Sequence, residues 1–240
     1  MDVTSRPAND TDRFRANAIS STTLIDKPTR VLLLRHADTA APQLFHGAES
    51  DLALSERGPR GAEAIAPSLA LQRPAAVISS PMRRAVETAT PIAWTCGLSL
   101  RVEKDLHERR IGALCGQPYD AIAGPWAETL RRWQAGDLSH ATVGAESFVD
   151  IRDRVMPVWS LLAETFKGET FVVVTHGAVI RVLLLCLNLG FTFWGGFSCP
   201  NLSLYELRMR PGHWRLACNG LGHVKSGDSD AHERRGEPET

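Results

Sequence analysis

The 240-residue chain lacks an excess of charge of either sign, because 27 Lys and Arg residues balance 27 Asp and Glu residues. A general nucleic-acid-binding protein usually carries a basic excess, so the balance argues against that class. Lysine itself is scarce, since only four of the 27 basic residues are Lys. The planar guanidinium of the abundant arginines suits phosphate and carboxylate ligands, although GC-rich coding would give the same skew.

Two features of secreted and membrane proteins are also missing. The five cysteines are an odd number and none forms C-x-x-C, which argues against a disulfide framework or a thiolate zinc site and favours a reducing compartment. The most apolar stretch, residues 171–191, is interrupted by His176, Arg181 and Asn188 and is too broken for a membrane span. The first 23 residues hold no apolar signal-peptide region. We expect a cytoplasmic protein with no membrane partner.

Several common catalytic motifs are absent. The sequence contains no G-x-x-x-x-G-K-[ST], no G-x-G-x-x-G, no G-x-S-x-G and no H-E-x-x-H. Nucleotide-binding folds and serine hydrolases therefore lack support.

Composition divides the chain into three parts. Residues 1–29 are polar and without periodicity, which predicts a mobile N-terminal arm. Residues 225–240 contain no aliphatic residue larger than Ala and predict a disordered tail. Residues 30–224 show no repeat or linker, so we expect one compact catalytic domain.

Within this domain, short aliphatic runs alternate with helical segments. Strands are expected at 30–35, 75–79, 99–102 and 170–175, followed by a hairpin of 202–208 and 214–218 around Pro211-Gly212. Helices are expected from Ser55 toward Leu71, from Pro81 until Pro91 kinks or ends it, and at 121–134, 147–166 and 178–189. The alternation predicts an α/β fold with a mainly parallel sheet and helices on both faces.

Three of these strands end in residues suited to chemistry. The first runs into Arg35-His36, the second into the Arg83-Arg84 pair, and the third into His176-Gly177. Ligands of parallel sheets bind at the carboxyl ends of the strands, so we expect these side chains to share a pocket. Histidines and arginines without a carboxylate suit an anion and repel a divalent metal. A neutral imidazole is a competent nucleophile once its tautomer is fixed, and phosphoryl transfer chiefly needs positioning and charge neutralisation. A protonated carboxyl group could supply the leaving group's proton.

Six motifs occur in an order that resembles a known family. LLLRHADT, D-x-x-L-S-x-x-G (51–58), ISSPMRRAVETA, LHERRIG, GAES and VVVTHG are similar to the landmarks of the histidine phosphatase superfamily, the phosphoglycerate-mutase-like enzymes. The similarity extends from about Arg30 to His223. It implies a three-layer α/β/α sandwich whose sheet is mostly parallel with one reversed strand.

The resemblance also implies a role for each site residue. His36 would be transiently phosphorylated, and Glu108 would be the general acid and base. Arg35, Arg84, His176 and Gly177 would hold the phosphoryl group. Arg84 rather than Arg83 matches the family arginine, because it directly precedes the alanine of R-A-x-x-T-A.

The first loop departs from the family pattern. Ala37 and Asp38 replace a common glycine and glutamate, and Pro42 stands where an asparagine often contacts the phosphate. Gln43 or His46 is the candidate substitute. A zinc site formed by His36, His176 and Glu108 is disfavoured by the adjacent arginines, so we expect neither metal nor cofactor.

These observations favour a metal-independent phosphomonoesterase that hydrolyses a small phosphorylated metabolite. A phosphoglycerate mutase is the nearest alternative, although the stretch between Gly116 and Trp133 is short for a mutase of this family. A catalytically silent phosphate-binding protein is a third reading, and fold similarity alone does not decide among them. The expected partner is a small phosphate ester; a homodimer is left open.

Overall fold

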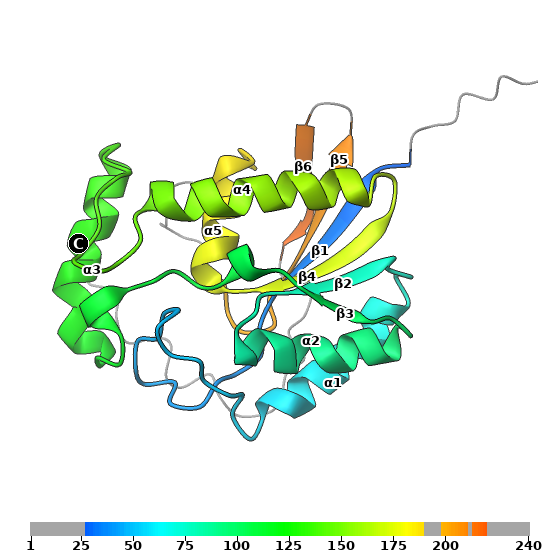
Figure 1. Cartoon of the computed structure of the whole chain (residues 1–240), viewed down its shortest axis with the longest axis horizontal. Coiled ribbons are helices and arrows are strands. Elements are labelled where there is room, and N and C mark those ends of the chain that lie inside the picture. Colours follow the sequence, from blue (N-terminus) through cyan, green and yellow to red (C-terminus); the bar gives the residue numbers. More distant parts are fainter. Residues whose placement is uncertain (1–26, 190–197, 211–212, 220–240) are drawn as a thin grey trace, which may run out of the picture.

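A computed structural model describes residues 27–189, 198–210 and 213–219, and its centre is one six-stranded sheet (Figure 1). The strands are β1 (Thr29–Arg35), β2 (Ala76–Ser79), β3 (Leu100–Val102), β4 (Thr170–Thr175), β5 (Leu204–Arg210) and β6 (His213–Asn219). Their order is β3-β2-β4-β1-β5-β6. Strands β1 to β4 are mutually parallel, β5 is antiparallel to β1, and β6 is antiparallel to β5. The reversed strand is therefore β5, and the expected fold is confirmed.

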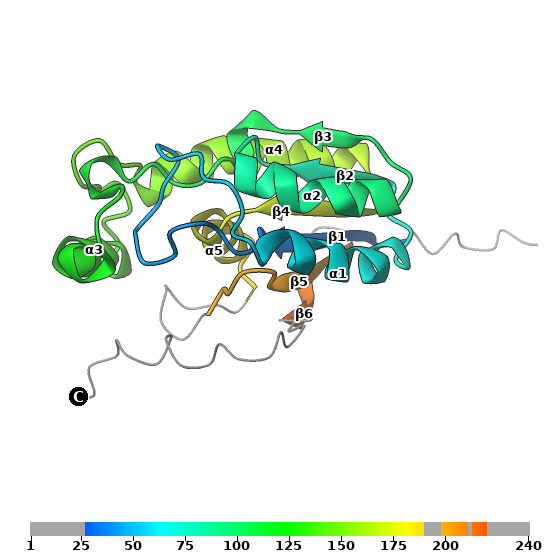
Figure 2. The ribbon, with the colours of Figure 1, turned by 90° about the horizontal axis from the view of Figure 1, so that it is seen from below.

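Helices cover both faces of the sheet, as Figures 1 and 2 show. The helices are α1 (Gly58–Ala70), α2 (Arg83–Thr95), α3 (Tyr119–Gln134), α4 (Phe148–Thr165) and α5 (Gly177–Cys186), with short 3-10 turns at Lys104–Leu106 and Gly112–Leu114. Alternate residues of β1 point to opposite faces. Leu32 and Leu34 pack with α1 and α2, whereas Val31 and Leu33 pack with α4 and α5. One apolar core therefore lies on each face of the sheet. Helix α3 lies beyond the end of the sheet (Figure 1).

Helix α2 continues through Pro91 to Thr95, so the expectation that Pro91 could end this helix is wrong. A proline inside a helix removes one backbone hydrogen bond and typically costs about 3 kcal/mol. Ala85, Ala89 and Ile92 of this helix are completely buried against the sheet. Tertiary packing therefore holds α2 together across the proline.

The boundaries of the domain are sharper in the structure than in the sequence. Strand β1 begins at Thr29, the last residue of the predicted arm, and this residue is buried. The rest of the predicted arm up to residue 26, the predicted tail 225–240 and the Pro211-Gly212 turn lie outside the described residues. In the described part of the chain, no helix is both long and apolar enough to cross a membrane.

Candidate active site

The carboxyl ends of three parallel strands bring the predicted site residues to one edge of the sheet. His36 follows β1, Ser80 follows β2, and His176 follows β4 and precedes α5. The ring centroids of His36 and His176 are 5.1 Å apart. Arg84, in the first turn of α2, acts electrostatically on both rings. The described structure therefore gathers residues that are far apart in the sequence.

His36 is held as a neutral imidazole with a defined tautomer. Its side chain is buried, and Nδ1 lies 2.8 Å from the carbonyl oxygen of Ala37. Because a carbonyl oxygen only accepts, Nδ1 carries the hydrogen and Nε2 keeps its lone pair. Burial, and then the positive charges of Arg35 and Arg84, hold the pKa of His36 well below its ordinary value of 6.5. At neutral pH this side chain meets the requirements of a nucleophile.

Two arginines provide the positive charge of the site. Arg84 is buried, and it donates from Nη1 to the carbonyl of Ser50 (3.0 Å) and from Nη2 to that of Gly47 (3.4 Å). Arg35 donates from Nη1 to the carbonyl of Cys199, and its buried Nε has no hydrogen-bond partner among the described residues. Burial lowers the pKa of Arg84, yet an arginine stays charged at neutral pH. These two cations suit a phosphate dianion.

His176 has one ring nitrogen engaged and one available. Its side chain is completely buried, and Nε2 lies 2.6 Å from the hydroxyl of Ser80. Nδ1 is buried without a hydrogen-bond partner in the part of the chain that is described. Burial is the largest cause that lowers the pKa of His176, followed by Arg84, His36 and Arg35.

The carboxylate of Glu108 lies at the start of α5, beside the residue pair His176-Gly177. Its Oε1 accepts from the backbone N–H of Arg109 (2.8 Å), and Oε2 lies 3.5 Å from the backbone nitrogen of Ala178. The charge of Glu108 also acts on Arg84. A carboxyl group in this place is suited to exchange protons with a phosphate ester held by the arginines.

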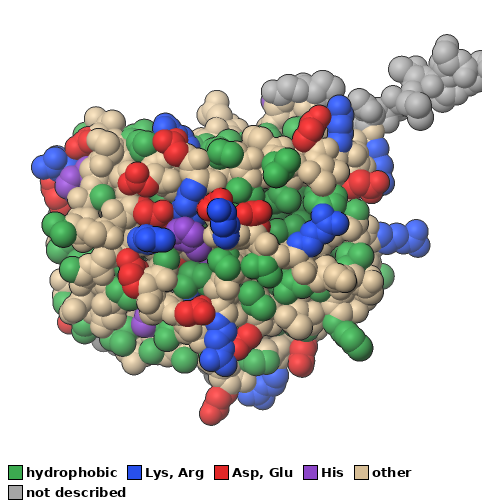
Figure 3. Space-filling model, viewed as in Figure 1, with side chains coloured by type: hydrophobic (Ala, Val, Ile, Leu, Met, Phe, Trp, Pro, Cys, Tyr) green, Lys and Arg blue, Asp and Glu red, His purple; other side chains and the backbone are tan. Residues whose placement is uncertain are grey.

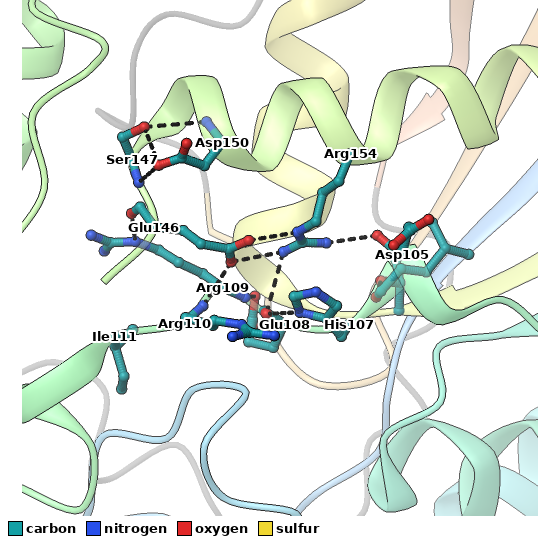
Figure 4. A network of polar contacts seen from close by, with 12 residues as sticks. Asp105, His107, Glu108, Arg109, Arg110, Ile111, Glu146, Ser147, Asp150 and Arg154 are labelled. Carbon is teal, nitrogen blue, oxygen red and sulfur yellow. Dashed lines mark hydrogen bonds and ion pairs between the residues drawn. The ribbon is translucent and has the colours of Figure 1, made fainter. Parts of the chain in front are cut away.

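A partly buried ion pair fixes the loop that carries Glu108 (Figure 4). Arg154 of α4 pairs with Glu146 of the GAES motif, with Nε to Oε1 at 2.8 Å. The same guanidinium donates to the carbonyls of Asp105 (2.7 Å) and Glu108 (3.3 Å). Figure 3, which has the view of Figure 1, shows a histidine in the middle of this face with charged side chains of both signs around it. The GAES motif thus serves the position of Glu108 through Arg154.

The first loop, which follows β1 and His36, carries the three residues of the sequence that concern the missing asparagine. Gln43 and Pro42 are exposed. Both ring nitrogens of His46 bond within the loop, Nδ1 with the hydroxyl of Ser50 (3.0 Å) and Nε2 with the carbonyl of Ala41 (3.1 Å). The carbonyl of Ser50 in turn binds Arg84. His46 therefore acts on the loop that holds Arg84, and the structure gives it no hydrogen bond to His36, His176 or Glu108.

Three further residues support the site without having been predicted. Ser80 binds His176, Thr88 accepts from the backbone N–H of Ala37 (3.0 Å), and Asn201 donates to the carbonyl of His36 (3.0 Å). Ser80 directly follows β2, at the same sheet edge as His36, and that position was a usable signal. Asn201 lies three residues before the first residue of β5, so its proximity became visible only once β5 was known to be the reversed strand.

Comparison with known proteins decides the family. The model of the histidine phosphatase superfamily (branch 1) matches residues 31–220. The chain belongs to this superfamily. This histidine phosphatase is 38% identical over 206 residues to the metal-independent phosphoserine phosphatase of Arabidopsis thaliana, covering 82% of the chain and 84% of the relative. It is 31% identical over 202 residues to the glucosyl-3-phosphoglycerate phosphatase of Mycobacterium tuberculosis, covering 77% and 86%.

The fold is also similar to that of a solved phosphatase structure. The native mycobacterial glucosyl-3-phosphoglycerate phosphatase superposes with a TM-score of 0.70 at 29% identity, covering 80% of this histidine phosphatase and 99% of that chain. The expectations of the family and of a phosphatase are confirmed. In the described ranges, no three His, Cys, Asp or Glu side chains are grouped as metal ligands.

Proposed function

We propose that this histidine phosphatase is a metal-independent phosphomonoesterase that hydrolyses a small phosphorylated metabolite through a phosphohistidine on Nε2 of His36. One observation carries the proposal: the 2.8 Å contact of Nδ1 with the Ala37 carbonyl leaves the Nε2 lone pair free on a ring that feels the positive charges of Arg35 and Arg84. A neutral imidazole in an anion pocket is the arrangement that covalent phosphoryl transfer requires.

The reaction takes two steps. The lone pair of His36 Nε2 attacks phosphorus, the ester P–O bond breaks, and the leaving oxygen takes a proton from the Glu108 carboxyl group. Water then attacks the phosphohistidine, gives a proton to Glu108 and breaks the P–N bond, which releases inorganic phosphate. Arg35 and Arg84 neutralise the charge on the non-bridging oxygens in both steps, and the Nδ1–H of His176 donates a hydrogen bond to one of them.

The relatives narrow the candidate substrates. Their names point to phosphoserine and glucosyl-3-phosphoglycerate, which are phosphate esters of small molecules that also bear a carboxylate. We propose the same class for this chain, with phosphoserine to be assayed first. The five free cysteines support action in a reducing compartment such as the cytoplasm.

Hydrolysis is preferred over mutase activity because the described segment between Glu108 and α4 is short. After the Glu108 loop, the chain forms one short turn at Gly112–Leu114 and α3 before it returns to α4. A mutase must exclude water to keep its phosphoryl group.

The test is a phosphorus NMR assay of purified protein with phosphoserine and, separately, with 3-phosphoglycerate plus a trace of its bisphosphate. Release of inorganic phosphate from either ester, without 2-phosphoglycerate, is the expected result. Interconversion of the two phosphoglycerates with little free phosphate would favour the mutase. Phosphate binding without turnover of any ester in a wider panel would favour the silent binding protein.

A further inference from the structure

Asn201 lies beside the catalytic strand although it is 165 residues from His36 in the sequence. It precedes β5, which runs antiparallel to β1. The backbone N–H of Leu202, the next residue, bonds the carbonyls of Arg35 (3.2 Å) and His36 (3.3 Å). The segment just before β5 is therefore attached to the peptide units that carry the nucleophile.

The side-chain amide of Asn201 makes three contacts at this point. Nδ2 lies 3.0 Å from the carbonyl oxygen of His36, 3.0 Å from that of Ala37 and 3.4 Å from Nδ1 of His36. An amide can be turned either way round, and here only one orientation is chemically consistent. With Oδ1 in the same place, three oxygens would face one another.

The two hydrogens on Nδ2 of Asn201 determine which of these three contacts are hydrogen bonds. An amide nitrogen has two hydrogens, and the two carbonyls take both. None is left for Nδ1 of His36, which keeps its own hydrogen and donates it to Ala37. Asn201 thus holds the acceptor of the imidazole N–H in place and offers the imidazole no donor that would favour the opposite tautomer.

We propose that Asn201 is a positioning residue that fixes the orientation and the Nδ1–H tautomer of His36. The proposal rests on the proposed role of His36 as nucleophile. It matters in both chemical steps, because phosphorylation of Nε2 leaves a positively charged ring whose Nδ1–H still needs the Ala37 carbonyl.

A purely structural role explains the side chain poorly. Backbone bonds already attach the segment to β1, since the N–H of Leu202 binds Arg35 and His36 and the N–H of Arg35 binds the carbonyl of Ser203 (3.0 Å). Among the residues that the structure describes, the Asn201 amide adds hydrogen-bond contacts to His36 and Ala37 alone. Its loss should change the chemistry more than the fold.

Asn201→Ala and Asn201→Asp test this, with Ser203→Ala as the matched control in the same segment. Asn201→Ala should lower kcat roughly 10- to 100-fold with little change in KM or Tm, because misplacement of a reacting group costs about that much. Nitrogen-15 NMR of the His36 ring should show a mixture of tautomers in this variant and the single Nδ1–H form in the parent chain. Ser203→Ala should match the parent in both readouts.

Asn201→Asp keeps the size of the side chain, removes the two hydrogen bonds that Nδ2 donates to the carbonyls of His36 and Ala37, and puts a carboxylate near Nδ1 of His36. Arg35 and Arg84 lower the pKa of His36, and His176 is the other titratable ring beside it. The added negative charge should raise the pKa of His36, so the acid limb of the kcat/KM profile should move to higher pH. The Asp variant gives a pH readout that is independent of the tautomer measurement in the Ala variant.

Parent-like kcat, a single Nδ1–H tautomer in Asn201→Ala and an unshifted acid limb in Asn201→Asp would overturn the proposal. Because the NMR measurement reads the ring without turnover, it separates this failure from a failure of the proposed function. A parent chain with no esterase activity but an Asn201-dependent tautomer would contradict the function and leave the positioning intact.

Discussion

The hydroxyl oxygen of Ser80 lies 2.6 Å from Nε2 of His176 in the buried centre of the site. The same oxygen accepts from the backbone N–H of Met82 (3.3 Å), so its one hydrogen is available to Nε2. His176 then carries its own hydrogen on Nδ1, the nitrogen without a partner among the described residues. Ser80 thereby selects the tautomer that can donate to a phosphoryl oxygen.

Ser80→Ala should lower kcat/KM about 5- to 100-fold, since an unsatisfied buried acceptor costs about 1–3 kcal/mol and the donor on Nδ1 is no longer fixed. Steady-state kinetics on an aryl phosphate measure this. Ser79→Ala is the matched control, because the Ser79 hydroxyl binds only the carbonyl of Ser80 and should affect kcat/KM much less. Equal losses in both variants would contradict the tautomer role.

Glu108→Gln separates acid catalysis from charge. The amide cannot give a proton to the leaving group, so turnover of an alkyl ester such as phosphoserine should fall far more than hydrolysis of an activated aryl phosphate. The expected ratio of the two losses is on the order of 10². Single-turnover rates with both esters give the ratio directly. Equal losses would assign Glu108 a positioning role instead.

Acid should weaken this protein through its two buried histidines. Burial and the neighbouring arginines lower the pKa of both His36 and His176 in the folded state from 6.5, so below that pH the unfolded chain binds more protons. The free energy of unfolding should therefore fall as pH drops from 7 to 5, by up to about 1.4 kcal/mol per pH unit for each histidine. Carboxylates with lowered pKa, such as that of Glu146, act only near and below 4.5.

Urea titrations from pH 8 to pH 5 measure this slope. His36→Gln should lower the number of protons taken up on unfolding, and with it this slope, by up to one. The acid limb of kcat/KM in the parent chain should lie below pH 6.5. A slope that is identical in the parent and in the variant would show that His36 is not a source of the effect.

Arg154→Met should destabilise the fold and misplace Glu108 together. The Arg154 and Glu146 side chains are each 13% exposed, so removing one partner should cost less than the roughly 3–5 kcal/mol of a fully buried pair but more than an exposed pair contributes. The carbonyls of Asp105 and Glu108 lose a donor as well. Urea unfolding and kcat measure the two effects. Arg131→Met is the control, because its pair with Glu128 is exposed to solvent on α3 and its loss should leave the free energy of unfolding almost unchanged. A similar stability change in both variants would contradict the buried anchor.

The sequence predicted the parts of this molecule that depend on local pattern. Continuous aliphatic runs marked β1, β2 and β4, and the residues after them, His36 and His176, were placed at one sheet edge by the rule for parallel strands. Ser80 and Asn201 were not assigned, because their value depends on a hydrogen-bond partner about 100 or more residues away. Pro91 does not end α2, because the packing of the buried face of this helix outweighs the helix-breaking tendency of proline. The first loop has no periodicity, and its attachment to Arg84 through backbone carbonyls leaves no side-chain pattern.

Trapping of a phosphoenzyme tests the central claim most directly. Rapid acid-free quenching of the parent chain with phosphorus-32-labelled substrate, followed by peptide mapping, should give an acid-labile, base-stable phosphoryl group on His36. His36→Ala should form none and lose turnover, whereas His107→Ala, which alters a nearby histidine whose Nδ1 contacts only the Glu108 carbonyl among the described residues, should still form it. Full turnover by His36→Ala, or a label on another residue of the parent chain, would contradict the account.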